Sequence, residues 1–308
     1  MKDDMSTLIV RVPNWVGDVC KALPALDALR QSGFRLHLVG RPWISDLLAG
    51  LDLPMSAVGR GIREPARALR DLGYSEGLLL TESFGTAASF RLAGIRAVGF
   101  RGDYRSPLLF RAVDRPNDLH EVTAYWHLGR EAQRTFAPRT GWLGSEPTRL
   151  ELPLVDAHRV VADEALTAAG VEAPFTLLGP AAIGTRGGRS KVWPLWRELT
   201  RRLHADGVRL VACPGPDEED TCAATTPEAT QIVGLGLGAY GAVCARAKRV
   251  VANDSGPLHL AAAVGAEAYG IDLTGEATRR PLGGRFISRH GRWPTVDEVL
   301  AALPQDAI

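Results

Sequence analysis

The chain has 308 residues, of which 45% are hydrophobic and 23% charged. These are values of a globular protein, they argue against extended disorder, and the length favours two domains of roughly 150 residues each. The formal net charge of +1 divides into +4 for residues 1–150, with 20 basic and 16 acidic residues, and −3 for the remainder, with 16 and 19. This imbalance is too small to indicate a nucleic-acid partner.

The cysteines and the apolar runs indicate the cellular compartment of the protein. Cys20, Cys213, Cys222 and Cys244 form no CxxC pair, so the sequence predicts neither a zinc site nor a disulfide framework. The N-terminus lacks the apolar core of a signal peptide, and no 18 apolar residues run together. We therefore expect a cytoplasmic protein, for which contact with a membrane surface remains open.

The first half alternates short apolar runs with amphipathic helical patterns. The predicted strands are Leu8–Val12, Leu36–Val39, Gly77–Leu80 and Val98–Phe100, and the predicted helices are Val19–Arg30, Ile44–Leu48 and Thr86–Leu92. This order indicates a parallel sheet with helices on both faces.

The alternation restarts after a predicted helix at Asp156–Ala169. The later strands are Phe175–Leu178, Val208–Ala212 and Arg249–Ala252, and the later helices are Leu195–Ala205 and Gly238–Arg246. We predict an α/β protein of two Rossmann-like domains, residues 1–155 and 156–308, with parallel sheets facing a central cleft. In such sheets ligands collect beyond the carboxyl ends of the strands.

The first strand runs through PNWVGD into a helix, which places Gly17 and Asp18 at the helix start. A carboxylate held there can act as a general base. For an isolated Gly-Asp before a helix, the more common role is compensation of the helix dipole, which favours negative charge at this end.

The segment NDSGPLHLAAAVG, residues 253–265, follows a buried strand and opens a helix. Ser255 can cap the helix, Gly256 admits a ligand close to the backbone, and unpaired amides favour an anion there. His259 lies one turn further along the same face, and Asp254 stands at the strand end. An ordinary capped strand-to-helix turn is the alternative.

A glycine-rich loop, residues 179–191, follows the first strand of the second half. Its backbone amides, Gly184 and Thr185 can wrap a diphosphate, and Lys191 can supply a compact charge. A solvated basic loop is the alternative.

Two weaker signals lie nearby. The acids at 217–220 follow a strand, and one of them, Glu219, is a candidate for ribose hydroxyls, although such a cluster is commonly a solvated helix start. Gly234–Gly241 approaches GxGxxG and keeps an NAD-dependent oxidoreductase as a competing hypothesis; we expect it to be a flexible loop.

Arginines are frequent in the first half. Arg101 and Arg105 flank a short loop and can clamp carboxylates or phosphates of an acceptor, and Ser83 lines the same side.

Four segments together resemble the lipopolysaccharide heptosyltransferases, glycosyltransferase family nine. They are NWVGDVCKALPALDALR, TESFGTAASFRLAGIRAVGFRGDYRSPLLF, GGRSKVWPLWRELTRRL and NDSGPLHLAAAVG. The first is most similar to the second-heptose type. The chain departs from the family pattern at Cys213-Pro214. It departs again after Gly265, because the family has an apolar strand and a Phe-Gly-Pro-Thr-Asp-Pro loop there, which residues 266–276 match poorly.

The resemblance implies a GT-B architecture with the acceptor in the first domain and the nucleotide-sugar in the second. By motif, Asp18 matches the catalytic base, Thr185 and Lys191 the diphosphate contacts, and Asp254, Ser255, Gly256 and His259 the donor-binding helix start. Gly17 and Gly184 belong to the same donor set.

The function thus expected is inverting transfer of a heptose-like sugar from an ADP-sugar to a lipopolysaccharide inner-core acceptor, an anionic glycolipid. Lys191, Thr185 and helix-start amides would stabilise the leaving diphosphate, so neither a metal nor another cofactor is required. We expect a monomer with peripheral membrane contact and no nucleic-acid partner. Transfer of another sugar to a different surface polysaccharide and non-catalytic nucleotide-sugar binding remain alternatives.

Overall fold

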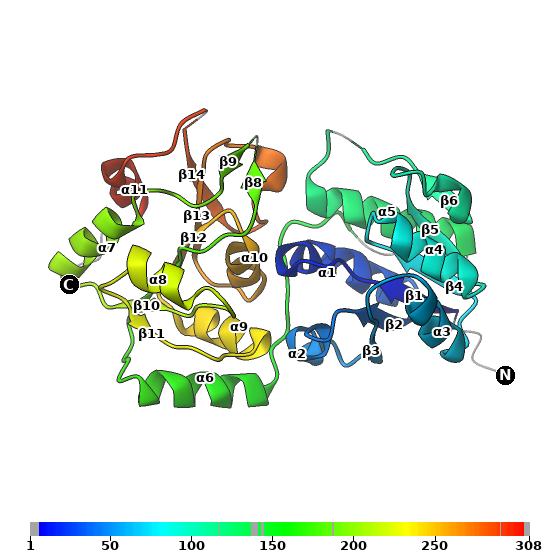
Figure 1. Cartoon of the computed structure of the whole chain (residues 1–308), viewed down its shortest axis with the longest axis horizontal. Helices are drawn as coiled ribbons and strands as arrows, with labels where there is room; N and C mark the ends of the chain where they lie inside the picture. The colour runs from blue at the N-terminus through cyan, green and yellow to red at the C-terminus, as the bar shows by residue number, and fades with distance from the viewer. Residues whose placement is uncertain are drawn as a thin grey trace. The chain divides into compact units, whose positions relative to one another are not determined.

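A computed structural model of the chain describes residues 6–116, 118–136, 141–142, 145–186, 188–289 and 291–304 (Figure 1). These residues form two compact units. The first lies within Met1–Ser45 and Leu51–Thr148, and the second within Asp46–Gly50 and Arg149–Ile308. Residues 149–155, which we expected in the first domain, group with the second unit, as does the short segment Asp46–Gly50.

The first unit contains a six-stranded parallel sheet in the order β3-β2-β1-β4-β5-β6. Its strands are β1 (Thr7–Arg11), β2 (Arg35–Gly40), β3 (Met55–Ala57), β4 (Glu76–Leu79), β5 (Arg96–Phe100) and β6 (Arg111–Val113). Its helices are α1 (Val16–Gln31), α3 (Arg63–Asp71), α4 (Phe84–Leu92) and α5 (Glu121–Phe136), with 3₁₀ turns η1 (Ala49–Leu51) and η2 (Ser106–Leu108), and α2 (Ile44–Leu47) runs across the division between the units.

Helices cover both faces of this sheet. Helices α1 and α5 pack against each other, and α5 lies on β4, β5 and β6, while α3 and α4 pack together, with α4 on β4 and β5 (Figure 1). A core of Ile9, Leu69, Leu79 and Phe90 fills the α3–α4 side. Strands buried on both faces read as continuous apolar runs, which is why they could be recognised from sequence.

The second unit repeats the arrangement, in the order β11-β10-β7-β12-β13-β14. The strands are β7 (Thr176–Gly179), β10 (Leu210–Ala212), β11 (Thr230–Gln231), β12 (Arg249–Asn253), β13 (Ala268–Asp272) and β14 (Arg285–Ser288), with a hairpin of β8 (Thr185–Arg186) and β9 (Arg189–Ser190). The helices are α6 (Asp156–Ala168), α7 (Trp196–Ala205), α8 (Glu219–Thr225), α9 (Leu237–Arg246), α10 (Gly256–Ala263) and α11 (Val296–Ala302), with the 3₁₀ turn η3 (Ala277–Arg279).

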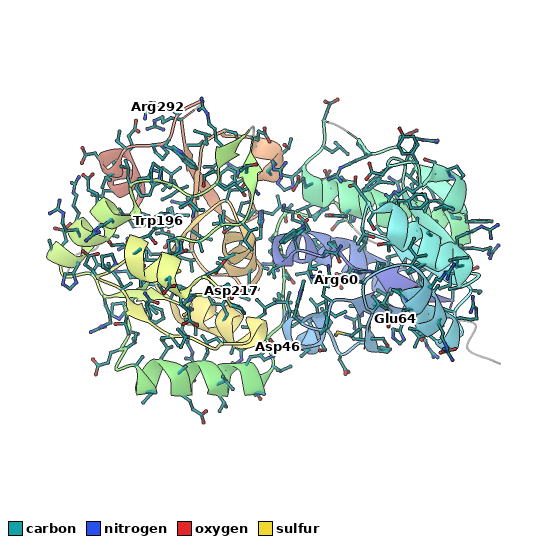
Figure 2. All side chains as sticks on the ribbon, in the orientation of Figure 1. Asp46, Arg60, Glu64, Trp196, Asp217 and Arg292 are labelled. Atoms are coloured by element: carbon teal, nitrogen blue, oxygen red, sulfur yellow. The ribbon has the colours of Figure 1, made fainter. Side chains whose placement is uncertain are left out.

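The core of the second unit is built around two tryptophans. Trp193 and Trp196 are each 1% exposed, pack edge to face with centroids 5.6 Å apart, and join the cluster that also contains Leu199 and Val251. Trp196 is labelled in Figure 2. This cluster seats α7 and α11 on the sheet. It also fixes the end of the loop that carries Lys191, because Trp193 follows that lysine by two residues.

The predicted α/β class with two parallel sheets is confirmed, and every strand and helix expected from sequence has a counterpart. The segment after Gly265, where the sequence departs from the family pattern, contains β13, a fully buried strand paired with β12 and β14. One expectation was wrong. The run Gly234–Gly241 is not a loop throughout, because α9 begins at Leu237 and buries Gly238 and Gly241.

In the described part of the chain, no helix combines the length and apolarity needed to span a bilayer.

Candidate active site

In the first unit, Asp18 lies in the first turn of α1, beyond the carboxyl end of β1. The helix begins at Val16, one residue before the buried Gly17, and its N-cap is the extended Trp15, which makes no side-chain capping bond. The Asp18 side chain is about one-third exposed. It therefore combines a favourable position at the positive end of a helix with access from solvent.

Lys21 and Glu121 accompany Asp18, and no local sequence pattern indicated Glu121. The Lys21 Nζ lies 3.2 Å from Asp18 Oδ1 and 2.6 Å from Glu121 Oε2. Lys21 follows Asp18 by three residues, a spacing that places both on one helical face. Glu121 opens α5, one hundred residues later, and packing of α1 against α5 brings it there.

The candidate acceptor residues occupy different environments. Ser83 is the N-cap of α4, where its hydroxyl accepts from Thr86 N, and it follows β4, the neighbour of β1. Arg101 is exposed and paired with Asp114, Nε to Oδ1, at 2.7 Å. Arg105 is 0% exposed. The two arginines expected to act as one clamp thus differ in burial and partners.

The Arg105 guanidinium has unused hydrogen-bonding capacity. Its Nη1 donates to the Thr81 carbonyl, whereas its Nε and Nη2 have no hydrogen-bond partner among the described residues. Burial lowers the pKa of Arg105, and the charges of Glu82 and Asp103 oppose this effect. Because buried donors are normally satisfied, this arginine is suited to an anionic ligand.

A tight turn directs Arg105 inward. Asp103 and Tyr104 both adopt left-handed backbone angles, with φ of 46° and 57°, and Gly102 has φ of 142°. Arg105 N then donates to the Gly102 carbonyl at 2.9 Å. Such angles cost about 1–3 kcal/mol at non-glycine residues, and they are concentrated at functional sites.

In the second unit, the candidate donor residues follow two neighbouring strands. The loop after β7 folds into the β8–β9 hairpin, in which Thr185 pairs with Ser190, the residue before Lys191. Helix α10 begins after β12, the strand paired with β7. Gly184 has φ of 90° and turns the chain into the hairpin. Thr185 and Lys191, six residues apart in sequence, are thereby brought onto one hairpin.

Asn253, at the end of β12, ties these two segments together. Its side chain is fully buried. The Oδ1 accepts from Trp193 N at 3.0 Å and from Trp196 Nε1 at 3.1 Å, and the Nδ2 donates to the Pro180 carbonyl at 2.5 Å. One amide therefore fixes both ends of the glycine-rich loop against the start of α10.

The start of α10 differs from the expected capping. Ser255 is the N-cap, but its hydroxyl makes no capping bond and instead points to the carbonyls of Asn253, at 3.3 Å, and Ala181, at 3.5 Å. The prediction of a side-chain cap was therefore wrong, and the first amides of the helix, Gly256 among them, are not taken up by this hydroxyl. His259 is buried one turn on, with Nε2 3.6 Å from Asp254 Oδ1.

Two acids near this edge have separate roles. Glu219 is exposed in the first turn of α8, after β10, and its neighbour Glu218 is the acid that accepts from Gly215 N, at 3.0 Å. Asp272, which the sequence did not single out, is buried at the end of β13. Its Oδ2 accepts from Thr274 N, Thr274 Oγ1 and Gly275 N at 2.5–2.9 Å, which orders the following loop.

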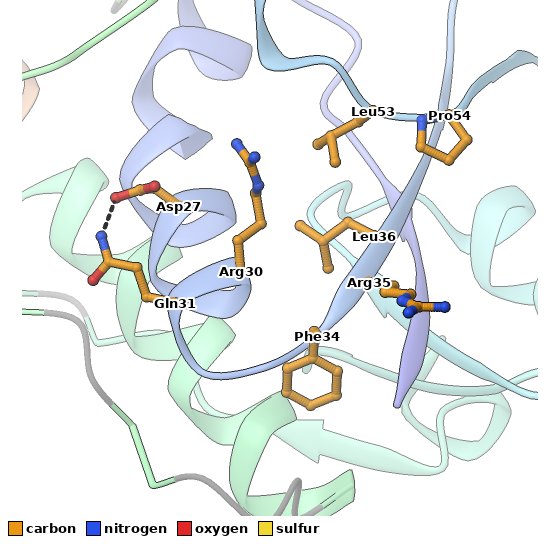
Figure 3. Close-up of a pocket in the computed structure, with 8 residues that line it drawn as sticks. All are labelled: Asp27, Arg30, Gln31, Phe34, Arg35, Leu36, Leu53 and Pro54. Atoms are coloured by element: carbon orange, nitrogen blue, oxygen red, sulfur yellow. Dashed lines mark hydrogen bonds between the residues drawn. The ribbon is translucent and has the colours of Figure 1, made fainter. Parts of the chain in front are cut away.

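The first unit also has an open groove of about 570 Å³, lined by residues such as Arg30, Phe34 and Leu53 (Figure 3). It lies where α1 ends and β2 begins, whereas Asp18 lies where α1 begins. The groove is therefore at the amino edge of the sheet, and none of the candidate residues lines it. Ligands of such sheets bind at the opposite edge.

Comparison with known proteins decides the family. The model of glycosyltransferase family 9 (heptosyltransferase) matches residues 62–271, about two-thirds of the chain. The chain belongs to glycosyltransferase family 9. It is therefore a glycosyltransferase. The match spans the segments with Arg105, Lys191 and Asn253, whereas Asp18 precedes it. No curated protein matches the sequence.

Solved structures show the same fold over the whole chain. Escherichia coli ADP-heptose lipopolysaccharide heptosyltransferase II has a TM-score of 0.72 at 21% identity, covering 96% of this chain and 98% of that one. E. coli heptosyltransferase WaaC with ADP gives 0.69 at 22%, covering 96% of each chain. A family 9 glycosyltransferase from Veillonella parvula gives 0.77 at 15%, covering 99% and 92%. The chain thus shares the GT-B class of two Rossmann-like units.

Among the described residues there is no group of three or more His, Cys, Asp and Glu side chains that could hold a metal ion.

Proposed function

We propose that this family 9 member is an inverting glycosyltransferase that moves a heptose-like sugar from an ADP-sugar to the inner core of lipopolysaccharide. The observation that carries the proposal is the division of polar groups between the units. A partly exposed carboxylate, Asp18, stands at the carboxyl edge of one sheet, and a helix start with Lys191 and Thr185 stands at that of the other. Structural neighbours described as ADP-heptose and ADP-bound heptosyltransferases support the choice of donor.

The second unit supplies the groups for the donor diphosphate. We assign the diphosphate to the amides at Ser255 and Gly256, with Lys191 and Thr185 donating from the hairpin. Backbone donors and a lysine held in advance stabilise charge that builds on a leaving phosphate. Asp254, His259, Gly184 and Glu219 belong to the proposed donor set, as does Gly17 of the first unit. Because Glu219 is exposed, its contribution should be small.

The first unit supplies the base and the acceptor site. The acceptor hydroxyl oxygen attacks the anomeric carbon from the face opposite the diphosphate and gives its proton to Asp18. The carbon–oxygen bond to the diphosphate breaks as the new one forms, and its electron pair leaves with the ADP oxygen. Configuration at the anomeric carbon is thus inverted. Arg105 and Ser83, with Arg101 further out, would hold an anionic group of the acceptor.

A donor panel tests the proposal. Purified protein is incubated with ADP-heptose, ADP-glucose, UDP-glucose or GDP-mannose and with a deacylated anionic inner-core acceptor, and products are followed by mass spectrometry. We expect only ADP-heptose, of the four donors, to give product, with product and free ADP formed in equal amounts. Activity with a hexose donor, and none with ADP-heptose, would contradict the proposed sugar while leaving the transferase assignment intact.

One observation favours keeping a second donor in the panel. The loop after β13 is ordered by Asp272, where the family pattern places a Phe-Gly-Pro-Thr-Asp-Pro loop. A different loop at the donor edge supports a different sugar on the same scaffold. Transfer of another nucleotide-linked sugar to a different surface polysaccharide is therefore the second candidate.

The proposed acceptor also bears on location and assembly. Because an inner-core acceptor is part of a glycolipid, we propose that the protein works in peripheral contact with the inner face of the membrane. We also propose that it is a monomer. Sedimentation with anionic vesicles, with and without the acceptor, tests the contact, and light scattering tests the monomer.

A further inference from the structure

A buried lysine lies between two carboxylates, one of which is the proposed base, Asp18. Lys21 is 5% exposed, and its Nζ lies between Asp18 Oδ1, at 3.2 Å, and Glu121 Oε2, at 2.6 Å. The Asp18 side chain is 35% exposed and that of Glu121 17%. The carboxylate that faces solvent thus has the longer bond to the lysine, and the more buried carboxylate has the shorter one.

The charges of this cluster set the properties of Asp18. An ammonium out of water needs a compensating carboxylate, and one carboxylate is sufficient for this. If Asp18 were the only partner of Lys21, its lone pairs would be committed to the lysine and its affinity for a proton would fall. Glu121 takes the shorter bond and neutralises the lysine, so two acids and one base leave one negative charge on the cluster.

We propose that Lys21 and Glu121 are positioning residues for the base: Lys21 holds the Asp18 carboxylate in place, and Glu121 offsets the lysine charge so that Asp18 keeps its affinity for the acceptor proton. This inference rests on the proposed function, in which Asp18 accepts that proton. It adds two residues, on α1 and α5, that would act through Asp18 without contacting substrate.

Tyr125, Cys20, Arg115 and Glu82 bear on the charge of this cluster. Tyr125 lies one turn after Glu121, and burial, together with the Asp18 charge, raises the pKa of its hydroxyl far above neutrality. Burial raises the pKa of the Cys20 thiol to about 12. Arg115 and Glu82, which also act on Tyr125, pair with each other. At neutral pH neither the Tyr125 hydroxyl nor the Cys20 thiol therefore adds a charge beside Asp18, Lys21 and Glu121.

Opposite shifts in pH dependence are the signature of this arrangement. In Glu121→Gln, Asp18 faces an uncompensated lysine, so the acid limb of kcat/KM moves to lower pH by about one unit and the plateau rate falls about tenfold. In Lys21→Met, two carboxylates face each other, so the limb moves to higher pH by about one unit. In the double variant the two changes offset, and the limb returns close to its parental position.

A measurement without turnover separates this inference from the proposed function. Protein labelled with carbon-13 at aspartate carboxyl groups is titrated by NMR, and the Asp18 signal is identified by its loss in Asp18→Asn. We expect its midpoint to move in the same directions as the acid limb. If Asp18→Asn transfers sugar at the parental rate, the base assignment fails; the NMR midpoints still test the charge balance.

Glu131→Gln is the matched control, because it makes the same substitution on the same helix and breaks pairs with Arg111 and Arg134. It should leave the Asp18 midpoint and the acid limb in place. Shifts of the same sign in Glu121→Gln and Lys21→Met, or no shift in either, would overturn the inference. Loss of folding in Lys21→Met would leave Glu121→Gln and the double variant to decide.

Discussion

In the first unit the candidate residues at the carboxyl edge are held by charges, whereas in the second unit they are held by a neutral amide. Lys21, Asp18 and Glu121 form an ionic cluster in the first. Asn253 hydrogen-bonds to Trp193, Trp196 and Pro180 in the second. Both sheets have the same strand order apart from the β8–β9 hairpin. One topology therefore supports two kinds of preorganisation.

The difference has a consequence for catalysis. Charged groups respond to pH and salt, so the Asp18 cluster should contribute to the pH dependence of the reaction. A buried, fully bonded amide does not titrate, so the contacts of Asn253 with Trp193, Trp196 and Pro180 should persist over the working range. A fold shared by two units thus does not fix their chemistry, which depends on the residues at the edge.

The largest effect should come from removing the charged base. Asp18→Asn should lower the rate of transfer about a thousandfold, because a general base contributes about 10²–10⁴. ADP affinity, measured by calorimetry, should remain within about twofold. Asp27→Asn, on the exposed side of the same helix, is the control and should keep the parental rate. A thousandfold loss of ADP affinity in Asp18→Asn would place Asp18 with the donor instead.

The next effect tests the second unit. Lys191→Met should lower kcat about a hundredfold, equal to about 3 kcal/mol of transition-state stabilisation, because a donor aimed at the leaving diphosphate is lost. Lys248→Met, at the amino end of β12, makes the same substitution at the opposite edge and should be neutral. Steady-state kinetics in ADP-heptose measure both. Equal losses of kcat in the two variants would show that Lys191 acts only through its positive charge and not through its position at the donor edge.

Stability separates the two modes of preorganisation. Asn253→Ala leaves two donors and a carbonyl without their partner and should lower the free energy of unfolding by about 2–3 kcal/mol. Asn14→Ala in the first unit removes one bond, from the charged Arg11 at 2.6 Å. Because Arg11 keeps its bond to the Val12 carbonyl, the loss should be about 1.5 kcal/mol, the low end for a charged hydrogen bond. Urea unfolding followed by tryptophan fluorescence measures both. A smaller loss in Asn253→Ala than in Asn14→Ala would contradict the role of the amide.

A smaller effect should distinguish the two arginines of the first unit. Arg105→Gln should raise the acceptor KM about tenfold to a hundredfold, since charged hydrogen bonds contribute about 1.5–3 kcal/mol and this buried guanidinium has unused donors. Arg101→Gln should change it less than about threefold, because exposed pairs contribute little. The reverse order in KM would assign the acceptor contact to Arg101.

The smallest effect concerns a buried histidine of the first unit. Burial lowers the pKa of His37 below its ordinary 6.5, and its ring nitrogens contact the hydroxyls of Tyr74 and Ser56, each at 2.9 Å. Below about pH 6.5 the unfolded state binds the proton more readily, so stability is lost as pH falls. The melting temperature of the parent, relative to His37→Gln, should therefore decrease from about pH 7.5 to about pH 5.5. A constant difference would contradict this.

The sequence predicted what depends on local patterns. Apolar runs and helix signals identified β1, β7 and β12, and the glycines and Pro257 identified α10 at the carboxyl edge of β12. These signals are local because strands buried on both faces, and helix starts, are determined by neighbouring residues. The alternation of predicted strands and helices also indicated that the chain divides into two similar halves.

What the sequence missed depends on contacts between distant residues. Helix α5 was not predicted, and the partner of Lys21 is its first residue, one hundred positions away. Lys21 itself could have been found, since it follows Asp18 by three on a predicted helix. Likewise, nothing local indicated that Arg105 is buried while Arg101 is exposed, because the turn at Asp103 and Tyr104 uses backbone angles rare for these residues.

The division of labour between the units is tested most directly by hydrogen exchange with saturating ADP, followed by mass spectrometry of peptides from both units. The account predicts added protection at residues 180–193 and 254–260, with a much smaller change in the peptide that contains Arg105. Protection confined to the first unit, or unchanged exchange in both donor loops of protein shown by calorimetry to hold ADP, would contradict it.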